Sequence, residues 1–180
     1  AGDGFSHIRI AQYVVVMVDK QHLGVLRHDV EHIGDALLAV FAGGFTVSAA
    51  EYVIGHGGAR AYETADVVAS LLDKSLLGRD GDRIGMLETI RQYAQEQLAV
   101  QNELDGALEP LAEWCLALAE DNVMAAYMAG GEQRLALLEQ EQANLRQALE
   151  WLYLQHDGQR LLHLASALGG FWYERSHYRE

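Results

Sequence analysis

Two histidines and a glutamate near the start of the chain have the spacing of a zinc site. His28, Glu31 and His32 match the pattern His-x-x-Glu-His, in which two histidines four residues apart on one helix face bind Zn²⁺ and the glutamate acts as a general base. A third ligand would have to come from downstream, for example Glu103 or Glu109. A polar face at a helix N-terminus, with Asp29 and Glu31 in the first turn, explains the same stretch, so the pattern leaves both interpretations open.

The sequence lacks the loop that holds phosphates in ATPases. No Gly-x-x-x-x-Gly-Lys-Ser/Thr motif occurs, and neither of the two lysines, Lys20 and Lys74, follows a glycine. The apolar residues 14–18 lead into Asp19, as in a strand that places an aspartate beside magnesium. Without the loop, a buried strand that ends at a turn is the better interpretation. We therefore expect no cofactor in this chain and no enzyme activity.

Three consecutive aromatic residues, Phe171, Trp172 and Tyr173, are candidates for binding a partner. The other two tryptophans, Trp114 and Trp151, fall at helical spacings and are expected in the core. Successive residues of a helix point about 100° apart, so three neighbours cannot all face inward. At least one of the three is therefore expected to meet a following repeat or a partner protein.

The composition is that of a folded acidic protein. Its 180 residues include 26 Asp+Glu and 13 Lys+Arg, a formal charge of −13, and 50% of them are hydrophobic. That apolar content supports a sizeable core and excludes general disorder. Both halves are acidic without a visible basic patch, which disfavours direct binding to nucleic acid. The longest apolar run, residues 13–18, is too short to span a membrane, and no signal peptide is recognisable, so we expect a cytoplasmic location.

The first half of the chain has the element order of a winged helix. Apolar residues three and four apart, with glycine clusters between them, predict three short helices. These are expected at residues 30–42, 46–54 and 64–73. Residues 75–86 are two short apolar pieces around Asp80-Gly81, which predicts a β-hairpin. Residues 1–35 form a divergent lead-in with room for a strand and a loop.

Beyond the hairpin the spacing predicts long helices only. They are expected at residues 87–100, at 107–129 with Pro110 in the first turn, from Glu132 to about Gln155, and at 159–175. Short breaks join them into antiparallel pairs, as in helical repeats, and a repeat array needs neighbours, so we expect truncated repeats. The predicted fold is mainly α: a winged-helix-like domain with one small β-hairpin at 36–100, followed by antiparallel helical repeats at 107–180.

Several stretches of the chain resemble large bacterial regulators of the STAND class. They are Leu38-Ala-Val-Phe-Ala-Gly-Gly-Phe-Thr-Val-Ser-Ala-Ala-Glu51, Leu71-Leu-Asp-Lys-Ser-Leu-Leu77, Met86-Leu-Glu-Thr-Ile-Arg-Gln-Tyr-Ala94, Glu141-Gln-Ala-Asn-Leu-Arg146 with Ala148-Leu-Glu-Trp151, and Phe171-Trp172 with His177. Such proteins are described as predicted ATPases and as LuxR-type or AfsR-like transcription factors. The resemblance covers residues 36–180 in order, and it does not extend to residues 1–35.

In that class an NB-ARC-like nucleotide-binding module precedes a winged helix and tetratricopeptide-like repeats. The resemblance implies that residues 36–100 are the winged-helix arm and that residues 107–180 are the first repeats. It also implies that ATP or ADP binds in an upstream module of the parent protein, and that this segment contacts adjacent domains or a protein partner. The arm would swing away from that module on activation, with the hairpin at 76–86 and the helix at 87–100 as the moving unit.

Related NB-ARC proteins carry a Met-His-Asp motif at the start of the helix after the wing, and its histidine contacts the ADP phosphate. The matching residues here are Met86, Leu87 and Glu88, so the histidine is missing and a carboxylate remains. Glu88 is thus the candidate residue at the nucleotide-contact position. A carboxylate cannot donate a hydrogen bond to a phosphate, which favours a contact to a basic group or a stabilising place at a helix N-terminus.

Three functions follow from these observations, in order of preference. The first is a non-catalytic regulatory segment of a STAND-type signal-transduction ATPase in transcriptional regulation, which couples nucleotide state to a helical-repeat sensor through protein contacts. The second is a winged helix that binds DNA directly and has a helical dimerisation arm, although its recognition helix would offer Lys74 against Asp66 and Asp73. The third is a zinc metallopeptidase-like site at His28, Glu31 and His32.

Overall fold

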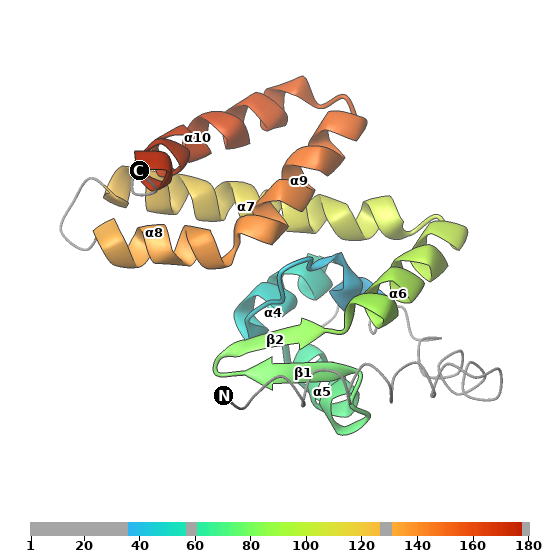
Figure 1. Cartoon of the computed structure of the whole chain (residues 1–180). Helices are drawn as coiled ribbons and strands as arrows, with labels where there is room; N and C mark the ends of the chain where they lie inside the picture. The colour runs from blue at the N-terminus through green and yellow to red at the C-terminus, as the bar shows by residue number, and fades with distance from the viewer. Residues whose placement is uncertain (1–35, 57–60, 127–130, 178–180) are drawn as a thin grey trace, which may run out of the picture.

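The computed structural model describes residues 36–56, 61–126 and 131–177 (Figure 1). Within these ranges the secondary-structure elements are all helices apart from one two-stranded antiparallel hairpin, which confirms the predicted fold class. A lower layer that contains the hairpin lies against an upper layer of four helices (Figure 1). None of the described helices is long and apolar enough to cross a membrane.

The lower layer, residues 36–100, is called the winged-helix part. It contains η1 (Leu38–Val40), α4 (Val47–His56), α5 (Ala61–Asp73), β1 (Leu77–Asp80), β2 (Arg83–Met86) and α6 (Glu88–Val100). This order agrees with the sequence prediction. Of the helix expected at 30–42, residues 30–35 lie outside the described ranges, and Leu38–Val40 form a tight 3₁₀ turn.

A short sheet organises the winged-helix part. Gly81 has the positive φ (+58°) that a two-residue hairpin turn needs, so Asp80 pairs with Arg83 on its other side. Phe45 adds a third stretch of extended chain, because its backbone N–H and C=O both bond to Ile84, each at 2.8 Å. Phe45 and Ile84 are fully buried, so the segment that precedes α4 and the hairpin pack together.

The upper layer, residues 104–177, is called the helical part. It contains α7 (Leu104–Ala126), α8 (Gly131–Gln140), α9 (Gln142–Leu154) and α10 (Gly158–His177). The long α7 lies in the middle and packs against the other three helices (Figure 1). Polar contacts tie its first turns to the α9–α10 turn: Trp151 Nε1 donates to Asp105 at 2.9 Å, and Arg160 bridges Glu109 and Asp157.

Two predicted helix boundaries are wrong. Helix α7 begins at Leu104, so Pro110 lies inside the helix and not in its first turn. The carbonyl that proline leaves without an N–H belongs to Gly106, an exposed residue whose carbonyl can bond to water. The single helix expected from Glu132 to Gln155 is divided at Glu141 (φ −91°, ψ 5°) into α8 and α9, which point in different directions in Figure 1.

The two parts share one hydrophobic core. Helix α4 packs on α7, and the ring of Phe41 meets that of Trp114 edge to face, with centroids 6.3 Å apart. Trp151 is buried and Trp114 is partly buried against the same core, as their helical spacing predicted. The division into domains at 36–100 and 107–180 remains a sequence prediction, while the packing across it is continuous.

Candidate coupling site between the winged-helix and helical parts

A buried acid and a buried amide stand at the bend between α8 and α9. Glu141 is 1% exposed and Asn144 is fully buried. Polar side chains in such places are stable only when hydrogen bonds or opposite charges replace the water that they lose. Both residues find these partners in the winged-helix part, not in their own helices alone. With Arg83 and the Gly43-Gly44 turn they form a network that we call the polar latch.

Arg83, the first residue of β2, provides the charge of the latch. Its Nη1 forms an ion pair with Glu141 Oε1, and its Nη2 lies 3.3 Å from Glu141 Oε2. The same Nη2 donates to the carbonyl oxygens of Gly43 at 2.9 Å and Gly44 at 3.0 Å. A planar guanidinium suits this geometry because its donors can serve a carboxylate and a neighbouring backbone turn together.

Asn144 bonds to one backbone donor and one backbone acceptor of the glycine turn. Its Oδ1 accepts from the Gly43 N–H at 3.1 Å, while its Nδ2 donates to the Gly44 carbonyl at 2.9 Å. Nδ2 also donates to Glu141 Oε2 at 2.6 Å. The side chain of Asn144 thus uses three of its four hydrogen-bonding positions within the latch.

Close backbone approach explains the two glycines. A Cβ on Gly43 would lie 2.9 Å from the Cβ of Ala143 in α9. Gly44 has φ +76°, and a Cβ there would lie 2.8 Å from the carbonyl oxygen of Ile84. Any larger residue would therefore push α9 away at the first position and β2 away at the second.

Two further polar contacts join neighbouring elements, the first between the two parts and the second within the winged-helix part. His56 Nε2 of α4 lies 3.1 Å from Glu113 Oε2 of α7, and Gln95 Nε2 of α6 donates to the Ala39 carbonyl at 2.9 Å. His56 and Glu113 are each more than 40% exposed, so solvent screens their attraction strongly. The buried latch is therefore the main polar connection that we assign between the parts.

This arrangement is suited to mechanical coupling. Its carboxylate, guanidinium and amide are all engaged with one another, and no nucleophile is placed beside a base. In the part of the chain that the structure describes, no group of three or more potential metal ligands lies together. The latch therefore joins two surfaces and has the chemistry of an interface.

The chain is similar to HTH-type transcriptional regulators of mycobacteria. One of these relatives is from Mycobacterium bovis and two are from Mycobacterium tuberculosis, and their names give that role as a prediction. Each is 31% identical over 185 residues, an alignment that covers 100% of this chain and 20% of the relative. The chain thus spans about a fifth of the length of the curated relatives that it matches. The alignment includes residues 1–35, for which the sequence offered no resemblance.

Comparison with family models gives no match. No solved structure matches significantly either. The similarity to the mycobacterial regulators is therefore what the comparisons contribute.

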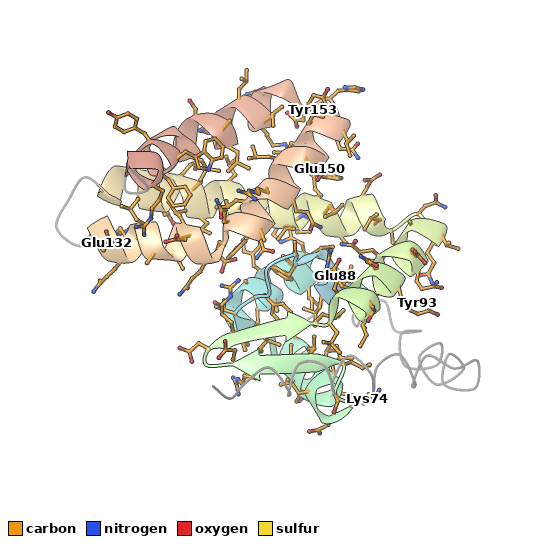
Figure 2. All side chains as sticks on the ribbon, viewed as in Figure 1. Lys74, Glu88, Tyr93, Glu132, Glu150 and Tyr153 are labelled. Atoms are coloured by element: carbon orange, nitrogen blue, oxygen red, sulfur yellow. The ribbon has the colours of Figure 1, made fainter. Side chains whose placement is uncertain are left out.

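Glu88 lies at the start of α6, at the position that the resemblance assigned to nucleotide contact (Figure 2). Its carboxylate accepts from Arg91 at 2.7 and 2.9 Å and from Gln92 at 2.9 Å, all within the same helix. Met86 and Leu87 line an open hollow of about 690 Å³ beside the hairpin, and Glu88 is not among its lining residues. The geometry agrees with a carboxylate held by a basic group at a helix N-terminus.

Replacing Glu88 should have a small, pH-dependent effect. Hydrogen bonds from the Arg91 guanidinium hold the pKa of the Glu88 carboxyl below its ordinary value. A lowered pKa adds stability at neutral pH, and this is lost as the pH falls through the folded-state pKa. Because the Glu88 side chain is 58% exposed, we expect Glu88→Gln to lower the free energy of unfolding by no more than about 0.5 kcal/mol.

Urea unfolding of both proteins at neutral and acid pH measures this difference. The two curves should converge at acid pH, where the wild-type carboxyl is protonated. A loss that stays constant across the pH range would contradict a role through the ion pair.

The aromatic triplet in α10 divides between core and surface. Phe171 is 3% exposed and belongs to the core, so the prediction that it binds a partner directly is wrong. Trp172 is 40% and Tyr173 is 64% exposed. These two keep the candidate role that the sequence gave to all three, because successive helical residues point to different sides.

The zinc candidates were predicted from the sequence, and the latch was not. His28, Glu31 and His32 lie outside the described residues, so the zinc hypothesis stays a sequence hypothesis. The sequence assigns no role to Arg83 and does not predict the latch. Its one signal was the Glu141–Arg146 stretch, which carried the family resemblance without an assigned role.

Proposed function

We propose that this chain is a non-catalytic regulatory segment of a transcriptional regulator of the STAND type. In it the winged-helix part serves as an arm for protein contacts, and the helical part begins a tetratricopeptide-like sensor. ATP or ADP would bind in another module of the parent protein. The resemblance of residues 36–180 supports the STAND part of this proposal, and the names of the mycobacterial relatives support a role in transcriptional regulation alone.

The position of Arg83 is the observation that favours protein contacts over DNA contacts. In a winged helix that reads DNA, a cation of the hairpin would serve best facing the phosphates. Here the Arg83 guanidinium turns toward the helical part and is neutralised by Glu141. The hairpin turn then presents the exposed Asp80 and Asp82 with the exposed Arg79.

The surface of α5 points the same way. Where its side chains are described, its charged residues are Asp66 and Asp73, both exposed, and Lys74 follows its last turn. Two carboxylates in the helix that would enter the major groove repel the phosphate backbone. The acidic charge of the whole chain, −13, adds to this repulsion.

A DNA-binding winged helix is the second candidate, and two observations favour it. The relatives are named HTH-type transcriptional regulators. Helix α5 packs on α4 and β1 and lies on the side of the winged-helix part away from the helical part, so the helical part does not cover it (Figure 1). Charge, not shape, is therefore what separates the two candidates.

DNA-binding measurements at low salt decide between them. We expect the chain to show no change in anisotropy with a fluorescent duplex at about 50 mM salt, where phosphate contacts are strong. The matched control is Asp66→Lys with Asp73→Lys, which reverses the charge of α5 without touching the core and should produce salt-dependent binding. Wild-type binding that weakens with salt would overturn the proposal in favour of the DNA reader.

The STAND assignment has its own test in the parent protein. A phosphate-binding loop in the coding sequence before this segment, with ATP bound by the intact protein, is the expected result. A parent protein without such a loop would overturn the ATPase part of the proposal while leaving transcriptional regulation open.

A further inference from the structure

The connection between the winged-helix and helical parts is closed by local hydrogen bonds. Helix α6 ends at Val100 and α7 begins at Leu104. Asn102 takes the left-handed conformation (φ +59°), with its N–H bonded to Ala99 O at 3.1 Å and the Glu103 N–H bonded to Leu98 O at 2.8 Å. This is a helix-ending motif that satisfies the last carbonyls, so the connection is a tight corner.

The two parts also meet along buried surfaces beyond this corner. Helix α4 and η1 pack against α7, and the shared core runs through the boundary without a break. The polar latch joins the two parts at a second place, far along the chain, where β2 and the glycine turn meet the α8–α9 bend. Contacts at several separate places oppose rotation of one part against the other better than a single hinge contact can.

We infer that the described residues of the winged-helix and helical parts move together as one rigid lever locked by the polar latch, so that conformational switching hinges outside these two parts. This inference rests on the proposed function for its biological use. It replaces the expectation that the hairpin and α6 move by themselves, because Arg83 of the hairpin is bound to the helical part. A signal sensed by the helical part would thereby reach the winged-helix part without an internal hinge.

A charged latch makes intermediate positions costly. If β2 rotated away from the α8–α9 bend, the carboxylate of Glu141 would lose Arg83 while still surrounded by protein. An unpaired buried charge is far less stable than a paired one, so the latch favours either full closure or complete separation. Apolar packing, which has no direction, would tolerate sliding more easily.

Distance measurements between spin labels test the lever in the full chain. Asp82→Cys at the hairpin turn and Ser166→Cys on α10 are exposed positions in different parts. The native Cys115 is buried, and burial raises the pKa of its thiol, so it does not compete for the label. A reference pair at Glu150→Cys and Ser166→Cys reports the width expected within the helical part alone.

We expect one narrow distance distribution across the parts, as narrow as that of the reference pair. Two latch variants should broaden it and shift its mean: Arg83→Gln with Glu141→Gln, which removes both charges together, and Asn144→Ala, which removes three hydrogen bonds. If circular dichroism shows that one variant does not fold, the distance distribution of the other variant alone tests whether the latch locks the parts. Glu88→Gln is the matched control, since it alters a carboxylate–arginine pair within one helix.

Each outcome bears on the inference separately from the proposed function. A broad or double-peaked distribution in the wild type would show an internal hinge and overturn the lever. A distribution that stays narrow in a folded latch variant would show that apolar packing alone locks the parts. DNA binding in the anisotropy assay would overturn the proposed function and leave the lever standing.

Discussion

Arg83→Met is expected to lower the free energy of unfolding by about 3 kcal/mol, because it leaves a buried carboxylate without its counter-ion. Glu141 is 1% exposed, so water cannot replace the guanidinium, and only the amide of Asn144 remains to bond it. Met keeps the length and apolar stem of the arginine side chain. The loss therefore reports the charge and its hydrogen bonds more than it reports packing.

Removing the other partner should cost less. After Glu141→Gln the charge of Arg83 remains, but its side chain is 23% exposed and can gain water, and it keeps the two carbonyls of Gly43 and Gly44. We expect a loss of about 1 kcal/mol for this neutral, isosteric change. The unequal exposure of the two partners thus predicts an unequal cost.

The double variant Arg83→Met with Glu141→Gln separates the two effects. It contains no unpaired buried charge, so it should be more stable than Arg83→Met alone despite carrying one more substitution. Thermal and urea unfolding measure the series, and a loss of 3 kcal/mol corresponds to a melting temperature about 6–12 °C lower in a chain of this size. The control Arg91→Met breaks the pair with Glu88, a carboxylate that is 58% exposed and can gain water, so it should change stability by less than about 1 kcal/mol.

A double variant less stable than Arg83→Met would contradict this account. It would mean that Glu141 contributes through contacts that do not depend on its charge, and that the latch is chiefly a matter of shape.

The elements that the sequence predicted well are those whose causes are local. Helices α4, α5 and α6 and the hairpin follow from apolar spacing and from Gly81, which lie within a few residues of the structure they determine. Glu88 was likewise assigned correctly to a helix start, and its partners Arg91 and Gln92 are three and four residues away. Local patterns of this kind can be read from a single sequence.

The latch could not be found in that way. Arg83 and Glu141 are separated by 58 positions, and Gly43 and Asn144 by 101, so no spacing rule connects them. The bend at Glu141 was missed for the same reason: the residue is a good helix former, and the distant Arg83 is what holds its carboxylate. Helical periodicity continues through the bend, and only the tertiary contact reveals it.

The Gly43-Gly44 turn gives the second large effect, and its two glycines should respond differently. Gly44→Ala is expected to lower the free energy of unfolding by about 3 kcal/mol, because it combines backbone strain at a positive φ with a steric clash. The new Cβ would lie 2.8 Å from the carbonyl oxygen of Ile84. That oxygen cannot move aside easily, since it accepts the hydrogen bond from Phe45 N–H at 2.8 Å.

Gly85→Ala in β2 is the matched control, because a Cβ there meets nothing within 4 Å and the residue has no positive φ. We expect it to be neutral or to add a few tenths of a kcal/mol by restricting the unfolded chain. Equal losses for Gly44→Ala and Gly85→Ala would show that any side chain in this region is harmful and that the turn has no special geometry.

Gly43→Ala should be destabilising in a way that a second substitution repairs. Its Cβ would lie 2.9 Å from the Cβ of Ala143, a side-chain atom, and φ at this position is not in the left-handed region. Adding Ala143→Gly removes that atom, so the pair should regain most of the loss except for about 1 kcal/mol from glycine in a helix. No neighbouring side-chain change can repair Gly44→Ala in this way, since its obstacle is the backbone of Ile84. Unfolding curves that show rescue at Gly43 and none at Gly44 would place the winged-helix turn in direct contact with α9, as the latch requires.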